Sequence, residues 1–398
     1  MLKKNKDFLI LFSLWLLVFA ASSQIMIISP ILPRIGEQLN INETLQGTLV
    51  SAYAILVGLM ALVMGPISDK IGRRRILLYG SSGMAIALSL HGLAFDYYSL
   101  LFVRSLAGVA GGVLSGAAVS YVGDYFPYDK RGWANGWIMS GIAMGQIVGI
   151  PLGTVLATQL GFQAPFLVFA VIMALDFFIV LKYLPQPNVE LDKNRITVVS
   201  ALKKYAEMLT HTEIIAASIS YLTMFLSVSI FIVFLPTWLE KSFSVSGNQI
   251  ASLFLVGGIA NVLTGPVVGK LSDKIGRKRL IITSCLGFSI ILFSSTLIIS
   301  NFWVAYPVFF IIMVLVAMRI SPFQALLTAM VDARQRGALM SLMIGIGQVG
   351  FGLGGAIAGP LYLFGGFGLN SVIGGFMILI MAFLVWRFLP EPNLNETT

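Results

Sequence analysis

Gly65-Pro-Ile-Ser-Asp-Lys-Ile-Gly-Arg-Arg-Arg75 decides the fold, because the chain repeats it as Gly269-Lys-Leu-Ser-Asp-Lys-Ile-Gly-Arg-Lys-Arg279. Eight of the eleven positions are identical, and the two copies lie 204 residues apart. Each copy separates two long apolar runs at the same place in its own half of the chain. A duplicated set of apolar helices with basic loops on one face is typical of membrane transporters built from two equivalent halves.

The composition also indicates a membrane protein. Hydrophobic residues make up 57% of the 398 residues and charged residues only 11%, whereas soluble domains carry about 25% charged residues. A soluble fold could not bury that much apolar surface, but a bilayer accommodates it. We therefore predict an all-α membrane protein with twelve transmembrane helices in two pseudo-symmetric six-helix halves. The predicted spans lie near 8–31, 45–67, 75–93, 99–123, 132–157, 165–183, 213–237, 248–268, 279–300, 302–330, 338–363 and 370–389.

The same reading predicts the domain organisation. Residues 1–184 and 213–398 are expected to form the two bundles, and residues 185–212 the link between them. Within this link, an apolar helical face is formed by Val198, Val199, Leu202, Tyr205, Ala206 and Leu209. This pattern predicts a short amphipathic helix along the inner membrane surface. A flexible linker remains the alternative, because the periodic stretch is short.

The distribution of positive charge predicts the orientation. Of the 26 Lys and Arg residues, Arg34 and Lys241 lie on one side of the predicted bundle, and Arg104 and Arg319 lie within spans. All the others lie on the side shared by the termini, the duplicated loops and the central link. By the positive-inside rule, both termini are cytoplasmic. The net charge of +9 then reflects topology and attraction to anionic lipid headgroups, so we expect no nucleic-acid partner.

Several classes of function lack their characteristic residues. Cys285 is the single cysteine, so no disulfide framework or cysteine metal site is expected. His91 and His211 fall at predicted loop edges and indicate neither a metal site nor a proton relay. No P-loop and no hydrolase motif is found, so we expect neither direct ATP use nor an enzyme, and no cofactor.

The duplicated loops resemble the loop motif of the major facilitator superfamily, G-x-L-x-D-x-x-G-R-K/R-x, and the resemblance covers almost the whole chain. The matching residues are Gly65, Asp69, Gly72, Arg73 and Arg74, and then Gly269, Leu271, Asp273, Gly276, Arg277 and Lys278. The second glycine of each copy permits a tight reversal between antiparallel helices. The aspartate lies close to the start of the next helix, where the helix dipole favours a carboxylate.

The resemblance also implies a gate on the inner face. Asp69, Arg73 and Asp124 would form a charge cluster that holds the outward-open state shut on the cytoplasmic side. Arg131-Gly132 resembles the family's Arg-Gly pair at the start of the fifth span (132–157 here), and Arg336-Gly337 repeats it at an offset of 205. The gating residues expected from this pattern are therefore Gly65, Asp69, Gly72, Arg73, Asp124, Arg131, Gly269, Asp273, Gly276, Arg277 and Arg336. A cluster of positive charge that only sets topology is the alternative.

Two arginines within spans are candidates for the substrate cavity, since a charge at mid-bilayer costs about 2.5–3.5 kcal/mol. The resemblance implies that Arg104 faces the cavity and takes part in substrate or proton coupling; local neutralisation by helix 1 or by carbonyls is the alternative. Arg319 matches no family motif and would either bind an anionic substrate or belong to the inner gate.

The remaining candidates are polar groups within the spans. Gln24 stands in helix 1, where multidrug relatives often carry an acid. Gln146, Asn261, Gln324 and Gln348 lie on helices that line the cavity in this fold, and they would bind a ligand or bond helix to helix. Asp176 is the acid well inside a span. It would form a packed polar pair or carry protons.

We expect a secondary active transporter that works by alternating access, with proton-coupled efflux of a small amphipathic or polar solute. The resemblance to bacterial efflux proteins implies a multi-pass protein of the bacterial inner membrane that acts as a monomer. An anion exchanger, a uniporter, or a lipid or glycolipid flippase of the same fold remain alternatives.

Overall fold

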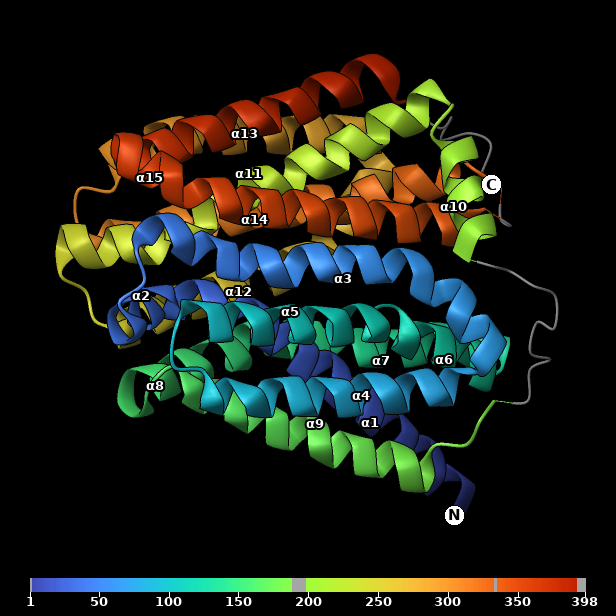
Figure 1. Ribbon diagram of the computed structural model, residues 1–398. Helices are drawn as coiled ribbons and strands as arrows, with labels where there is room; N and C mark the ends of the chain where they lie inside the picture. Colours follow the sequence, from blue (N-terminus) through green and yellow to red (C-terminus); the bar gives the residue numbers. More distant parts are fainter. Residues whose placement is uncertain (1, 188–197, 333–334, 392–398) are drawn as a thin grey trace.

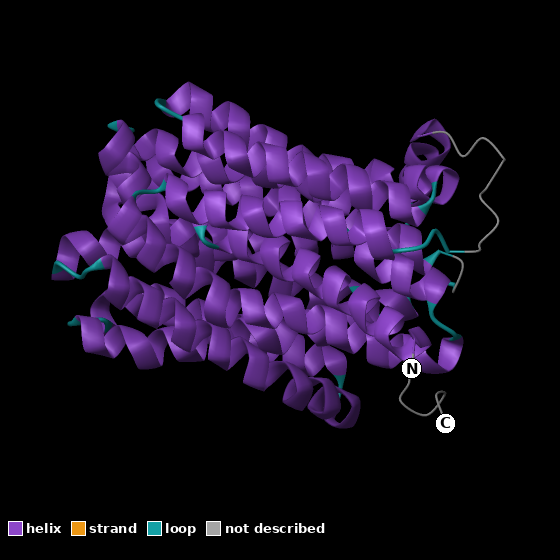
Figure 2. Ribbon diagram, turned by 90° about the horizontal axis from the view of Figure 1, so that it is seen from below, coloured by secondary structure: helices purple, strands orange, loops and turns teal. Residues whose placement is uncertain are grey.

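The computed structural model describes residues 2–187, 198–332 and 335–391. Within these ranges the chain forms helices and no strand, and the long helices run side by side (Figure 1, Figure 2). Eleven helical segments of this described part are long and apolar enough to cross a membrane. The last one, α15 (Arg336–Phe388), has 53 residues and a break at Gly365 and Gly366, so it supplies two spans. The predicted all-α fold with twelve transmembrane helices in two halves is therefore confirmed.

The elements of the first half precede residue 187. They are α1 (Leu2–Met26), α2 (Ile28–Leu39), α3 (Glu43–Ile71), α4 (Arg73–Leu90), η1 (His91–Leu93), α5 (Tyr97–Leu114), α6 (Ala117–Tyr125), α7 (Tyr128–Met144), η2 (Gly145–Gly149), α8 (Ile150–Leu160) and α9 (Gln163–Tyr183). The elements that follow are α10 (Val198–Met208), α11 (Thr212–Phe243), α12 (Gly247–Ile275), α13 (Arg277–Ile298), α14 (Phe302–Ala329) and α15.

Three spans of the first half are interrupted near their middle. The first is divided into α1 and α2 at Ile27, and the fourth into α5 and α6 at Gly116, whose φ of 72° suits glycine. The fifth contains η2, a π-helical turn in which the N–H of Ile150 bonds to the carbonyl of Gly145. Pro151 follows directly and has no N–H to offer a regular helix. Such wide turns often occur at functional sites, and here the turn carries Gln146.

Glycines bring α3 of the first half against α15 of the second. A Cβ on Gly47 would lie 2.0 Å from the carbonyl oxygen of Gly355, so only glycine permits this approach. The Ser51 hydroxyl donates a hydrogen bond of 2.6 Å to the carbonyl of Gly352 at the same interface. Small residues at helix contacts give membrane helices close van der Waals packing, and this seam joins the two halves.

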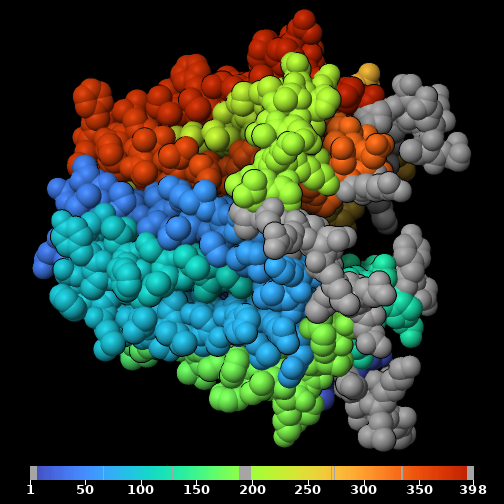
Figure 3. All heavy atoms as spheres, turned by 45° about the vertical axis from the view of Figure 1, so that its right-hand side comes forward, coloured from blue at the N-terminus to red at the C-terminus, as the bar shows by residue number. Residues whose placement is uncertain are grey.

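The two ends of the bundle differ in how closely the halves meet. We call the end that holds the start of α1, the end of α15 and the α3–α4 junction the terminal end, and the opposite end the far end (Figure 1). At the far end α2 packs on α11 and α8 on α12, and Lys241 forms an ion pair with Glu43. At the terminal end α6 and α14 form no comparable interface within the described ranges. Figure 3 shows a notch there, between teal and orange atoms. The α2–α11 and α8–α12 contacts thus close the far end, and no equivalent contact joins α6 to α14 at the terminal end within the described ranges.

The link between the halves contains helix α10, and residues 188–197 of the predicted link lie outside the described residues. Ala201, Tyr205 and Met208 are its buried side chains, and the Tyr205 hydroxyl donates to the carbonyl of Leu62. Val199 and Leu202 are exposed. The buried face therefore differs from the predicted apolar face, because α10 packs across α3 and α15.

Candidate functional site

A cavity of about 220 Å³ lies between the two halves. The first half contributes α1, α2, η2 and α8 to its wall, and the second contributes α11, α12, α14 and α15. Most of the wall is apolar and flexible, with Met26, Met224, Met313, Phe225, Phe254, Phe309 and Phe351 among its residues. The polar side chains of the wall are Ser29, Gln146, Asn261, Arg319 and Gln348. An apolar pocket with a few convergent polar groups is typical of small-molecule sites.

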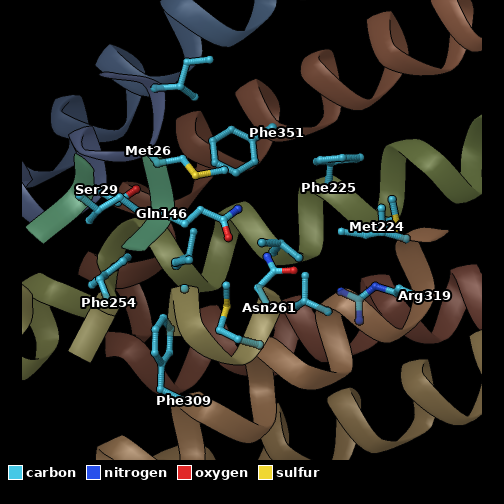
Figure 4. Close-up of a pocket in the computed structure, with 18 of the residues that line it drawn as sticks. Met26, Ser29, Gln146, Met224, Phe225, Phe254, Asn261, Phe309, Arg319 and Phe351 are labelled. Carbon is cyan, nitrogen blue, oxygen red and sulfur yellow. The ribbon is translucent and has the colours of Figure 1, made fainter. Parts of the chain in front are cut away.

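Four of the predicted cavity residues are brought together here, namely Gln146, Asn261, Arg319 and Gln348. The amides of Gln146 and Asn261 approach from opposite halves, and the guanidinium of Arg319 is turned toward Asn261 (Figure 4). Two amides offer donors and acceptors, while Arg319 offers donors and a fixed positive charge. The wall can therefore bind both neutral polar groups and an anion.

Arg319 has fewer hydrogen-bond partners than a buried guanidinium usually has. Its side chain is 0% exposed. Nη1 donates long hydrogen bonds to the Leu315 carbonyl (3.4 Å) and the Ser284 hydroxyl (3.5 Å), and the guanidinium lies 4.6 Å from the Phe288 ring centre. Nε and Nη2 have no hydrogen-bond partner among the described residues. Buried donors without partners are costly, which marks this corner of the wall as incomplete.

Arg104 occupies a different environment, outside the cavity wall. It is 1% exposed, and its Nη1 donates to Gln24 Oε1 and its Nε to the Leu49 carbonyl, both at 3.4 Å. The guanidinium lies 4.6 Å from the ring centre of Tyr53, whose hydroxyl accepts a 2.7 Å hydrogen bond from Gln24 Nε2. Arg104 is therefore hydrogen-bonded to α1 and to a carbonyl of α3. Gln24 and Arg104 thus form one buried cluster in the first half.

Gln324, the remaining predicted cavity residue, also lies outside the wall. It is exposed near the terminal end of α14 and hydrogen-bonds the side chain of Tyr221. Sequence reasoning missed the methionine and phenylalanine wall and Ser29, because apolar residues are expected at every packed position. His91 lies at the end of α4, as expected, and its ring is buried with its centroid 4.1 Å from that of Phe166.

The first copy of the duplicated loop forms the expected charge cluster. Arg73 forms an ion pair with Asp69, donates from Nε to Asp124 Oδ2 at 2.7 Å and from Nη1 to the Ser68 hydroxyl at 2.8 Å. Gly72 has a φ of 97°, which explains the glycine at this reversal. All of these residues belong to the first half. The cluster therefore joins α3, α4 and α6, and its role as a gate between the halves stays a prediction.

The second copy repeats the backbone of the first. Gly276 also has a φ of 97°, and Arg277 Nη1 donates to the Ala325 carbonyl at 3.2 Å. The side chain of Asp273 lies outside the described residues. The remaining gate candidates bond to nearby carbonyls, since Arg131 Nε donates to Phe126 and Arg336 Nε to Thr328. Gly65 and Gly269 lie on α3 and α12 just before the two loops.

Asp176 lies between two helices of the first half, away from the cavity. Its Oδ1 accepts a 2.6 Å hydrogen bond from the Ser13 hydroxyl of α1, and the side chain is 0% exposed. Its Oδ2 has no partner within the described part of the chain. Asp176 and Ser13 therefore form a packed polar pair, as the sequence predicts, and Oδ2 of Asp176 can also hold a proton.

Comparison with known proteins identifies the family. The sequence model of the Major Facilitator Superfamily matches residues 14–216 and again 217–398. The chain belongs to the major facilitator superfamily. It is therefore a transporter and not an enzyme.

Individual members of the superfamily resemble the chain over most of its length. The uncharacterized MFS-type transporter YceJ of Bacillus subtilis (strain 168) is 25% identical, over 88% of this chain and 89% of the relative. The multidrug resistance protein MdtG of Proteus mirabilis (strain HI4320) is 28% identical over 74% of each chain. The crystal structure of a D-xylose-proton symporter has a TM-score of 0.79 at 17% identity, over 98% of this chain and 99% of that one. At that identity the likeness concerns the fold alone.

Proposed function

We propose that this superfamily member is a proton-coupled exporter of small amphipathic or polar solutes in the bacterial inner membrane, with both termini in the cytoplasm. The observation that carries the proposal is the cavity between the halves, apolar with a few amides and one guanidinium in its wall. Resemblance to proteins named for multidrug resistance supports efflux. With the termini in the cytoplasm, the notch at the terminal end would admit a solute from inside the cell.

Alternating access follows from the asymmetry between the two ends. The far-end contacts between α2 and α11, and between α8 and α12, separate the cavity from that side. Release there requires those contacts to open while the terminal end closes, so the halves rock about the cavity. Glycine contacts such as Gly47 against Gly355 let α3 and α15 lie close together, and small residues at such a contact put few obstacles in the way of a sliding movement.

Asp176 is the group to which we assign the proton. Among the described residues, Asp176 is the only fully buried acid. Ionising it in place would leave a charge with one hydrogen bond in an apolar interface, which is costly. Loss of the proton therefore favours a movement of α1, which carries Ser13 near its middle and the cavity residue Met26 at its end. Protonation and cavity shape are linked through this helix.

Transport in proteoliposomes tests the proposal directly. We expect an imposed pH gradient to drive accumulation of a fluorescent amphipathic solute, and Asp176→Asn to lose that stimulation while it still equilibrates the solute. Glu213→Gln, which removes an exposed acid at the start of α11, is the matched control and should respond like the parent. Indifference of the parent protein to the gradient would contradict proton coupling and favour uniport or anion exchange.

A further inference from the structure

We propose that the cavity binds small amphipathic organic anions, with the carboxylate on Nε and Nη2 of Arg319 and the apolar tail directed toward Phe254 and Phe309. The inference rests on the proposed transport function and names the class of solute that the cavity takes. It rests on Arg319, a buried cation in the wall of a mostly apolar pocket, two of whose nitrogens have no hydrogen-bond partner among the described residues.

The first step concerns the hydrogen-bond donors of the Arg319 guanidinium that have no acceptor among the described residues. Nε and one Nη of an arginine lie side by side and match the two oxygens of a carboxylate. In Arg319 these two nitrogens lack partners among the described residues, whereas Nη1 is bonded to Leu315 and Ser284. The bonds through Nη1 and the Phe288 ring hold the group in place. The free edge is the one that a bidentate anion requires.

The second step is the sign of the local charge. No acidic side chain belongs to the cavity wall as far as the described residues define it. An arginine keeps its charge in proteins, so Arg319 makes the cavity electropositive without a compensating carboxylate. An organic anion gains from this field in a low-dielectric site, while an organic cation is repelled. The ligand itself would supply the missing countercharge.

The third step is the shape of the wall. Arg319 and Phe309 are ten residues apart on α14, which corresponds to about 15 Å along the helix axis. Figure 4 places Arg319 at one end of the lining side chains and Phe254 and Phe309 at the other. The centroids of the two phenylalanine rings lie 5.3 Å apart. A tail of one or two rings therefore fits beyond the amides of Gln146 and Asn261, and these amides lie beside its middle.

Contact with Arg319 requires a small rearrangement of the wall, since its side chain is 0% exposed. Met224 and Met313 also line the cavity. Methionine side chains have three rotatable bonds and adapt readily to new neighbours. We infer that a bound carboxylate reaches the guanidinium when one of these side chains turns aside.

Three probes with one apolar skeleton test the head-group preference: 1-naphthaleneacetate, its neutral amide, and 2-(1-naphthyl)ethylamine. Binding to the purified full chain in nanodiscs is measured by calorimetry. We expect the acid to bind about ten- to a hundredfold more tightly than the amide, the range for hydrogen bonds to a charged partner. The amine should bind least. Binding of the acid no tighter than that of the amide, including no binding of either, contradicts the proposal.

Variants separate a ligand contact from a gating role of Arg319. Arg319→Gln should remove the preference for the acid by weakening binding of the acid far more than that of the amide, and Arg319→Lys should retain part of the preference. Arg387→Gln removes one exposed charge at the end of α15 and should bind all three probes like the parent. If Arg319→Gln weakens acid and amide equally, Arg319 acts as a gate and the proposal is wrong. The comparison of the three probes on the parent protein decides the matter even if Arg319→Gln does not fold.

Transport of the same probes distinguishes this inference from the proposed function. Equal binding of acid, amide and amine, together with export driven by a pH gradient, would overturn the anion preference and leave proton-coupled efflux intact. Preferential binding of the acid without any effect of the gradient would contradict proton coupling and leave the anion site intact.

Discussion

Arg73 joins three helices at the terminal end of the first half. Its guanidinium binds Asp69 on α3, Asp124 on α6 and the Ser68 hydroxyl, while its own backbone starts α4. The side chains of Arg73 and Asp124 are 17% and 24% exposed, and that of Asp69 is 43% exposed. Ion pairs with this much solvent contact contribute about 1 kcal/mol or less to stability. Their charge therefore matters more for how the helices move than for whether the chain folds.

We predict that Asp69→Asn lowers the transport rate severalfold while the amount of protein in the membrane stays close to that of the parent. The reason is that Arg73 loses one of its two anionic partners and can no longer hold α3 to α4 and α6 in one arrangement. Asp273→Asn, the same change in the second copy of the loop, should have a smaller effect. Initial transport rates normalised to protein amount measure both. Full transport by Asp69→Asn would contradict the prediction.

Asp96 illustrates how one residue fixes the start of a helix at the far end. Its carboxylate accepts a 2.8 Å hydrogen bond from the backbone N–H of Ser99, and the two residues form a capping box at the start of α5. Hydrogen bonding to the side chain and then to the backbone of Ser99 holds the pKa of Asp96 below its usual value of 3.8. Because the folded-state pKa is lowered, the cap stabilises α5 above about pH 4 and weakens as the pH falls through the folded-state pKa.

We predict that Asp96→Ala increases amide hydrogen exchange in the first turn of α5 at neutral pH. Asp96→Asn should protect that turn nearly as well as the parent, since asparagine also caps helices, and its protection should not depend on the protonation of residue 96. Exchange measured at several pH values by mass spectrometry checks both variants. Equal protection in Asp96→Ala and the parent would show that the cap has no role.

At the scale of elements, the contact between α3 and α15 controls how the halves separate. We predict that Gly47→Ala forces these helices apart, because a Cβ there would lie 2.0 Å from the carbonyl oxygen of Gly355. The contact lies at the far end, so the variant should shift the population toward a state that is open there. Gly136→Ala on α7 is the control, since no other helix among the described residues comes within 4 Å of its Cβ position.

A cysteine in the cavity wall reports this shift. Met26→Cys lines the cavity, and the native Cys285 is buried, so background labelling is low. With the Met26→Cys reporter present, Gly47→Ala should raise maleimide labelling from the far-end side severalfold, and Gly136→Ala should leave it unchanged. Unchanged labelling in a folded Gly47→Ala protein would mean that another contact holds the far end closed.

At the scale of the whole molecule, the orientation in the membrane follows from charge. Arg75 and Arg279 end the two duplicated loops and are exposed, and Phe95 lies 79% exposed at the far end. We predict that a membrane-impermeant maleimide labels Phe95→Cys in intact cells but labels Arg75→Cys and Arg279→Cys only after the cells are permeabilised. Labelling of either loop from outside would reverse the proposed topology.

Sequence alone determined the two halves, the number of spans and the tight reversals at Gly72 and Gly276. These follow from apolar run length and from a glycine that must adopt positive φ, both of which are local properties. The charge cluster around Arg73 was also predictable, because Asp69 lies four residues before it in the loop motif and the family pattern supplied Asp124. These features can be predicted from residue spacing and from the repeat, because they do not depend on how the helices pack.

The tertiary structure decided which intramembrane arginine faces the cavity. Both Arg104 and Arg319 lie inside predicted spans. The structure shows that Gln24 and the Leu49 carbonyl bind the first, while two nitrogens of the second have no partner among the described residues at the cavity wall. That difference depends on breaks at Ile27 and in η2 and on which helices meet across the halves. A hydrophobic pattern that is apolar on every face does not specify rotation about a helix axis, because lipid and protein interior are equally apolar.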